Sequence, residues 1–287
     1  MSAGRFAAAL LLLGLATSCA ETPGRPVFFD LALEALPGDD GDPARFTSAS
    51  GWQVELDRAV IAIGPIYLYE NPPLDRQADD AWTERPLHAL LGWVEASAHA
   101  HPGDNLFDGG AIKGEYLQQI AFDLIDQPKA GLGLARGVAG QVGSLSLILW
   151  EPGDATLGAV ELLEDHHAYV IGRASKDGVT IEFAGGVLIP DIGVKRRVDG
   201  LAADFELDDG GLLIVGVDPA AWFDQADFEL LTSQAEQDEQ GRWVIDEATQ
   251  VGIAWNQALH RPYAWTGRWQ ADAASLAEYP LVEGASE

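Results

Sequence analysis

Two histidines one residue apart, His99 and His101, open the stretch HAHPGDNLFDGG, which also contains Asp104 and Asp108. In an extended segment, side chains two residues apart project to the same side, so both imidazoles are expected to face one ion. Neutral imidazole binds zinc, copper, nickel and iron, and carboxylates nearby add oxygen ligands. Two histidines make half of a tetrahedral site, so the spacing predicts a metal site that folding must complete.

A second histidine pair, His166 and His167, follows Asp165 and is expected to begin a strand. Adjacent residues of a strand point to opposite faces, so one member of the pair is expected to join the site. Asp165 is expected to hold the ligating imidazole through its other ring nitrogen. The mixed nitrogen and oxygen set predicts zinc or copper as the bound metal.

Two alternatives to this binding site remain open from the sequence. In the first, HAHPGDN is an exposed polar turn and the later pair starts a strand, with no shared ion. In the second, the metal supports hydrolysis, with Glu115 as the acid or base. The sequence has no GxSxG, P-loop or HExxH motif, and GLGLARG from Gly131 to Gly137 lacks dinucleotide-fingerprint spacing and is expected to be a loop. Binding is therefore favoured over catalysis.

Aromatic residues near the C-terminus supply a second candidate site. Tyr263, Trp265 and Trp269 occupy alternate positions in HRPYAWTGRWQ, with Gly267 as the gap. On a strand they would share one face and form a platform for sugar rings or another flat ligand. The alternative is that the stripe is half of a sandwich core.

The chain begins MSAGRFAAALLLLGLATSCAET, with Arg5, an apolar run from Phe6 to Ala16, and small residues before Cys19. This layout is typical of a secretory signal, and the run is too short for a membrane span. The segment resembles the lipobox of bacterial lipoproteins. That resemblance implies removal of residues 1–18, lipid on Cys19 and a membrane anchor. The alternative is ordinary cleavage after Ser18 or Ala20.

Charge and cysteine content narrow the function classes. The chain carries a formal charge of −28, and residues 1–18 contain Arg5 and no acidic residue, so the remainder stands at −29. Such a field repels nucleic acid and anionic headgroups and concentrates cations. Cys19 is the single cysteine, so disulfides do not stabilise the processed chain and burial of a core must do so.

Short segments of alternating or continuous apolar residues, bounded by Gly, Pro, Asp or Asn, recur along the chain. About ten such segments predict a mainly β fold, an antiparallel β-sandwich-like domain with one or two short helices. Helices are expected after Asp218 and from Thr249 to His260, and a hairpin turn at Lys176–Gly178.

The predicted organisation is a signal peptide at 1–18, a lipidated cysteine and tether at 19–26, one β-rich domain at 27–272 and an acidic tail at 273–287. The sequence thus predicts an exported, lipid-anchored protein at the periplasmic face or the surface of the outer membrane. Its domain is expected to bind a transition-metal ion through histidines. The alternative is a recognition or scaffold module for glycan or envelope protein, without metal.

Overall fold

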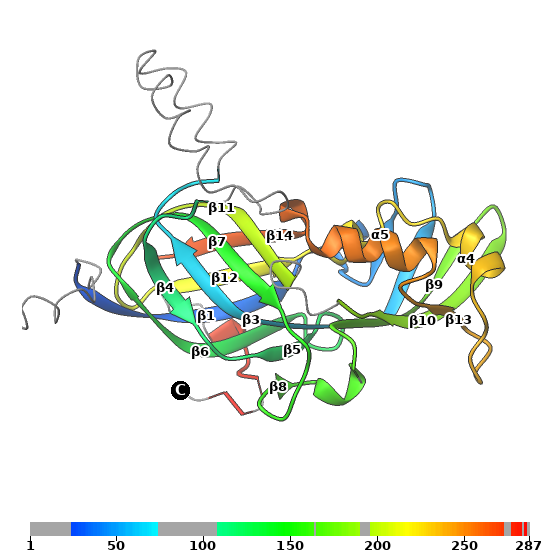
Figure 1. Ribbon diagram of the computed structural model, residues 1–287, viewed down its shortest axis with the longest axis horizontal. Coiled ribbons are helices and arrows are strands. Elements are labelled where there is room, and N and C mark those ends of the chain that lie inside the picture. The colour runs from blue at the N-terminus through cyan, green and yellow to red at the C-terminus, as the bar shows by residue number, and fades with distance from the viewer. Residues whose placement is uncertain are drawn as a thin grey trace, which may run out of the picture.

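Strands dominate the protein, which is described here from a computed structural model (Figure 1). The structure describes residues 24–73, 108–163, 165–189, 196–272, 277–282 and 284–285. Within these residues fourteen strands form one mixed sheet. The predicted fold class, mainly β and sandwich-like with few short helices, is confirmed.

The strands follow the apolar alternation of the sequence. Their bounds are β1 (Pro26–Ala35), β2 (Arg45–Thr47), β3 (Gln53–Tyr69), β4 (Ile112–Tyr116), β5 (Ile120–Asp123), β6 (Lys129–Val138), β7 (Gly140–Leu149), β8 (Leu157–Gly158), β9 (Ala168–Lys176), β10 (Val179–Val187), β11 (Arg197–Leu207), β12 (Leu212–Val217), β13 (Trp243–Ile245) and β14 (Trp265–Gln270). The helices are α3 (Pro219–Trp222), α4 (Phe228–Gln234) and α5 (Gln250–Leu259), with 3₁₀ turns η1 (Asp39–Gly41), η3 (Val160–Leu162) and η5 (Pro262–Ala264).

Most strand pairs are antiparallel, as predicted, but the sheet also contains parallel pairs. These are β1 with β12, β10 with β13 and β5 with β8. The members of the first two pairs are far apart in sequence, which leaves chain enough for the long connection that a parallel pair requires.

Strand β3 runs through two parts of the sheet. Its second half belongs to a ring of strands in the order β3, β4, β6, β1, β12, β14, followed by β11 and β7, which returns to β3 (Figure 1). Packing of β11 against β14 closes this ring of strands. At that contact the aromatic side chains of Phe205 and Trp269 stack with their centroids 5.2 Å apart. Apolar side chains such as Phe29 and Leu147 fill the interior.

The first half of β3 belongs to a smaller sheet, which we call the small sheet and which consists of β2, β3, β9, β10 and β13. Helices α3, α4 and α5 pack on one face of it (Figure 1). Aromatic rings fill that layer: Phe183 and Phe228 stack at 5.0 Å, and Trp222 and Trp255 at 5.7 Å. The opposite face of the small sheet is polar.

The expected helices and hairpin turn are present. Asp218 and Thr249 cap α3 and α5 by accepting hydrogen bonds from the backbone N–H groups of Ala220 and Gly252. In the hairpin between β9 and β10, Asp177 and Gly178 have φ of 51° and 81°, as a type I′ turn requires. No helix among the described residues is long and apolar enough to cross a membrane.

The segment GLGLARG is a strand, β6, and not the predicted loop. Its glycines allow close contact that a side chain would block. A Cβ on Gly131 would lie 2.8 Å from the carbonyl oxygen of Tyr279, and a Cβ on Gly137 would lie 2.5 Å from that of Lys113. Residues 277–282, which belong to the predicted acidic tail, lie against β6 at Gly131. The N–H of Gly131 donates to the carbonyl of Pro280, and the N–H of Val282 donates to the carbonyl of Gly131.

Candidate functional site

The predicted metal site is only partly described. His99, His101 and Asp104 lie outside the described residues. Asp108 is exposed, and its carboxylate accepts a hydrogen bond of 3.2 Å from the backbone N–H of Gly110. Within the described ranges, no three His, Cys, Asp or Glu side chains are grouped so as to hold a metal ion. The metal site therefore stays a prediction.

The two adjacent histidines before β9 have different surroundings. His166 is partly exposed, and its ring lies so close to Gly186 that an added Cβ there would come within 2.3 Å of the imidazole Cγ. The backbone carbonyl of Leu163 lies 3.2 Å from its Nδ1 atom. His167 is 1% exposed. Asp165, which was expected to hold the ligating imidazole through its other ring nitrogen, is exposed.

The hydrogen bonding of His167 bears directly on metal binding. The backbone N–H of Ile189 donates to its Nδ1 atom at 3.2 Å, so the neutral ring carries its proton on Nε2. Burial, followed by the charge of Arg196, lowers the pKa of His167 to about 4. The Nε2 atom is buried and has no hydrogen-bond partner among the described groups. Neither nitrogen offers a free lone pair in this arrangement, so His167 does not present a metal ligand here.

Glu115, the candidate acid or base, is engaged in an ion pair. The guanidinium of Arg136 lies directly across the β4–β6 pair and donates to one carboxylate oxygen from Nε at 2.9 Å and from Nη2 at 2.5 Å. This cross-strand pair lies on the outside of the ring. The described structure shows no metal-ligand group beside it.

The predicted aromatic platform is not assembled. Tyr263 lies in η5 and is exposed, whereas Trp265 begins β14 and is buried, with Nε1 donating to the carbonyl of Leu259 at 2.9 Å. Trp269 packs edge-to-face on Phe29 inside the ring. The alternative, in which the stripe belongs to the core, holds for both tryptophans because alternate residues of β14 face the ring interior.

The exposed face of the small sheet carries two rows of polar side chains that cross four strands. In the first row Arg45, Glu55, Arg173 and Glu182 stand directly opposite one another on β2, β3, β9 and β10. The second row lies two residues along each strand and consists of Thr47, Gln53, Ser175 and Thr180. We call this surface the two-row face.

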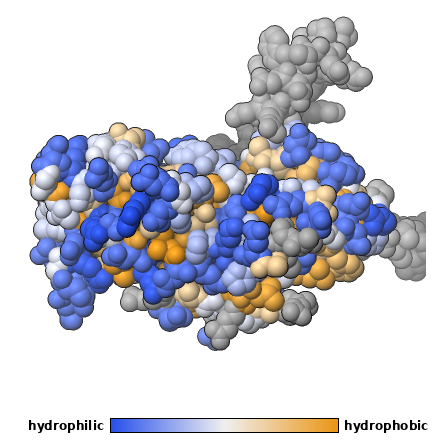
Figure 2. All heavy atoms as spheres, turned by 180° about the vertical axis from the view of Figure 1, so that it is seen from behind, coloured by the Kyte–Doolittle hydropathy of each residue, from blue (hydrophilic) through white to orange (hydrophobic). Residues whose placement is uncertain are grey.

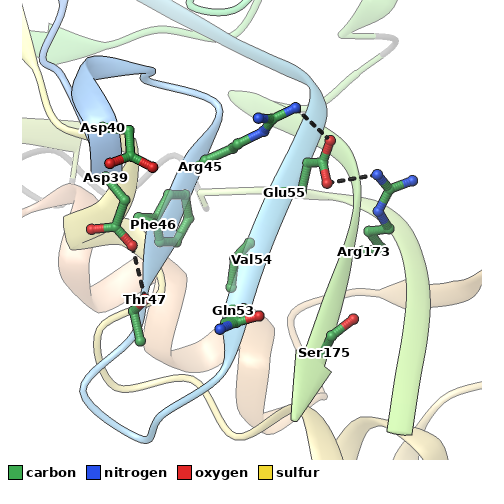
Figure 3. A pocket seen from close by; sticks show the side chains of 10 residues that line it. All are labelled: Asp39, Asp40, Arg45, Phe46, Thr47, Gln53, Val54, Glu55, Arg173 and Ser175. Atoms are coloured by element: carbon green, nitrogen blue, oxygen red, sulfur yellow. Dashed lines mark hydrogen bonds and ion pairs between the residues drawn. The ribbon is translucent and has the colours of Figure 1, made fainter. Parts of the chain in front are cut away.

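Glu55 holds the charged row together (Figure 3). One of its carboxylate oxygens lies 3.4 Å from Nη2 of Arg45, and the other lies 2.6 Å from Nη2 of Arg173. The hydrogen bond from Arg173 is the main cause that lowers the pKa of Glu55. The same contact raises the pKa of Arg173, which also faces Glu182. Both signs of charge are therefore fixed in alternation across the strands.

The neutral row and an acidic rim border a hollow of about 290 Å³ over β2, β3 and β9 (Figure 3). Asp39 lies at the rim in η1, where its carboxylate accepts a hydrogen bond of 2.8 Å from the hydroxyl of Thr47. The hydroxyls of Ser175 and Thr180 are 3.0 Å apart. The hollow is open, and its lining combines donors, acceptors and groups that do both with two apolar residues, Phe46 and Val54.

Comparison with protein-family models, curated proteins and solved structures finds no match for this chain. The two-row face therefore rests on its own geometry. Its polar alternation on β3, with Gln53 and Glu55 against Val54, is visible in the sequence as the outer side of a half-buried strand. The rows themselves depend on the register of three strand pairs, which no single segment of the sequence contains.

Proposed function

We propose that the protein is an exported, lipid-anchored recognition module of the cell envelope that binds an extended, uncharged glycan on the two-row face. The observation that supports this most directly is the ordered set of donors and acceptors across four strands, left open on one side of a sheet whose other side is covered by helices.

The chemistry of the face favours hydroxyl groups as its ligands. Sugar hydroxyls both donate and accept hydrogen bonds, and the face offers guanidinium donors, carboxylate acceptors, and amide and hydroxyl groups that do both. The two rows contain no aromatic or aliphatic side chain, unlike the core of a typical protein interface. The hollow is open and mostly polar, unlike the apolar pockets that enclose small molecules.

The charge balance favours an uncharged ligand. The two arginines of the first row are matched by Glu55 and Glu182, and Asp39 and Asp40 add negative charge at the rim. An anionic polymer would be repelled both by this rim and by the chain's net charge of −28.

Binding is tested with the processed chain starting at Cys19, on an array of neutral and acidic oligosaccharides. Arg173→Gln removes the guanidinium that orients Glu55, so we expect affinity for neutral glycans to fall at least tenfold. Arg136→Gln is the matched control because Arg136 also pairs directly across two strands with a glutamate, but on the ring. Retention of neutral glycan by both variants, or no glycan binding by the parent chain, would contradict the proposal.

The anchor is tested separately by expressing the full chain in a bacterial host. We expect mass spectrometry to find diacylglycerol on Cys19, and Cys19→Ala to move the protein from the membrane fraction to the soluble fraction. An unmodified N-terminus at Ala20 or further along would show ordinary cleavage and would remove the anchor from the proposal.

A further inference from the structure

Two large apolar side chains lie together on the outside of the ring. Phe28 on β1 and Leu134 on β6 are each 54% exposed. In the β1–β6 register Phe28 faces Arg136 and Asp30 faces Leu134, so the two apolar residues are diagonal neighbours on one face. Their chain neighbours Phe29 and Ala135 point into the core. The fold therefore gives no internal reason for large apolar groups at these outer positions.

The polar groups around this pair are largely neutralised. Arg136 pairs with Glu115, and Arg25 pairs with Asp208. Asp209 accepts the backbone N–H of Phe28 at 2.9 Å. Both arginines beside the exposed apolar pair are thus held in ion pairs, which lowers the cost of bringing this surface close to an apolar phase.

Asp30 lies between apolar neighbours on the same face. Leu134 and Leu212 stand directly opposite it on β6 and β12. Burial raises the pKa of Asp30, and among the described residues no cation pairs with it. The charge left on this face is therefore negative, which disfavours contact with an anionic surface and leaves an electrically neutral surface as the better match.

The place where the chain enters the fold lies beside Phe28. The carbonyl of Arg25 accepts the backbone N–H of Ala139 at 2.9 Å, which fixes the start of β1 against the end of β6. Five residues lie between Cys19 and Arg25, so six Cα-to-Cα steps separate the two, which reach about 20 Å when fully extended. A lipid on Cys19 therefore keeps the bilayer within that distance of this end of the ring.

We propose that the Phe28–Leu134 face is the membrane-facing surface of the anchored protein and inserts its two side chains into the interface of a zwitterionic bilayer. This inference rests on the proposed lipid anchor. The two side chains add a second, weak contact to the acyl chains and orient the domain, so that the anchor does not act as a free tether. The two-row face lies on the small sheet, away from the proposed membrane contact.

The test supplies the acyl chain chemically. Because Cys19 is the only cysteine, the processed chain is coupled there to a maleimide bearing one fourteen-carbon chain, which gives marginal and reversible membrane binding. Partitioning onto phosphatidylcholine vesicles is then measured by co-sedimentation. Phe28→Thr with Leu134→Thr is expected to lower the partition coefficient about tenfold, since both side chains lose burial in the interface.

Val179→Thr with Ile253→Thr is the matched control, because these residues are 55% and 47% exposed but lie on the small sheet and α5. We expect it to leave partitioning unchanged, and we expect the parent chain to bind vesicles rich in phosphatidylglycerol less strongly. An equal loss in both double variants, or none in the Phe28 and Leu134 variant, would overturn the inference. So would dimerisation through Phe28 in the absence of vesicles. Chemical coupling makes these outcomes independent of natural acylation and of glycan binding.

Discussion

Two stretches of β3 show how one strand serves two different environments. In its middle, where it pairs with β5 between the small sheet and the ring, Ile61 and Ile63 point into the core, while Val60 and Ala62 on the outer side are also buried, under the segment that includes Leu163. The small-sheet half buries one side only, so its residues alternate between apolar and polar. Strands buried on both sides read as continuous apolar runs, and strands buried on one side read as alternation.

This difference assigns stability mainly to the buried ring interior and ligand binding to the exposed face of the small sheet. The ring is filled by side chains, so a change inside it removes packing. Around the small sheet the helices supply the packing, and the two-row face is free to carry polar groups that a ligand can contact. On the side opposite to that seen in Figure 1, the surface shows apolar patches separated by hydrophilic residues (Figure 2). Substitutions inside the ring should therefore lower stability strongly, whereas substitutions on the two-row face should affect ligand binding more than stability.

The largest effect is expected in the ring interior. Phe29 is buried against the ring of Trp269, with centroids 5.8 Å apart. Phe29→Ala removes an aromatic side chain and leaves a cavity that a ring of strands cannot close by collapse, so the free energy of unfolding should fall by about 3–5 kcal/mol. Urea denaturation of the processed chain measures this loss. A change below about 1 kcal/mol would show that the ring interior is loosely packed and that packing does not distinguish it from the two-row face.

An intermediate effect is expected at the junction of the two regions, where His167 precedes β9. Its pKa is lowered from 6.5 to about 4 in the folded protein, mainly by burial, so the unfolded chain binds a proton more readily. This contribution to stability is fully present above pH 6.5 and is lost as the pH falls from 6.5 toward 4, by about 3 kcal/mol in total.

His167→Asn isolates that contribution, because the amide oxygen still accepts the N–H of Ile189 but does not titrate. We expect the parent chain to lose stability more steeply than the variant between pH 6.5 and 4, as measured by denaturant midpoints. Shifted carboxyl groups such as Asp218 and Glu55 titrate in both proteins and cancel in the difference. Parallel pH profiles would place His167 in a solvated environment and refute its assignment as a buried neutral ring.

Local patterns in the sequence predicted most elements and their ends. The caps at Asp218 and Thr249 and the turn at Lys176–Gly178 depend on neighbouring residues, and all three are confirmed. Strand β6 was missed because glycine lowers strand propensity, whereas here Gly131 and Gly137 admit the backbones of other segments. Such tertiary contacts leave no local pattern.

The site was harder to predict than the fold. The predicted metal site combines His99 and His101 with one histidine of a distant pair, and because His99 and His101 lie outside the described residues, that prediction remains open. The two-row face draws Arg45, Glu55 and Arg173 from three strands, and the distance between the first and last of them in sequence gives no indication that they share one carboxylate. The required information is the strand register, which single-strand alternation does not contain.

The smallest change in stability is expected on the two-row face itself. Arg173 is exposed and its ion pair with Glu55 is partly solvated, so Arg173→Gln should lower the free energy of unfolding only slightly, by much less than Phe29→Ala. Arg136→Gln, the matched pair on the ring, should cost a similar amount. If denaturation shows that Arg173→Gln costs several kcal/mol, the charged row is a structural clamp of the small sheet, and loss of glycan binding in that variant would no longer report on the face. If both variants lose the same small amount of unfolding free energy, glycan binding is the property that distinguishes Arg173 from Arg136. This is the result expected of a face that does not take part in packing the core.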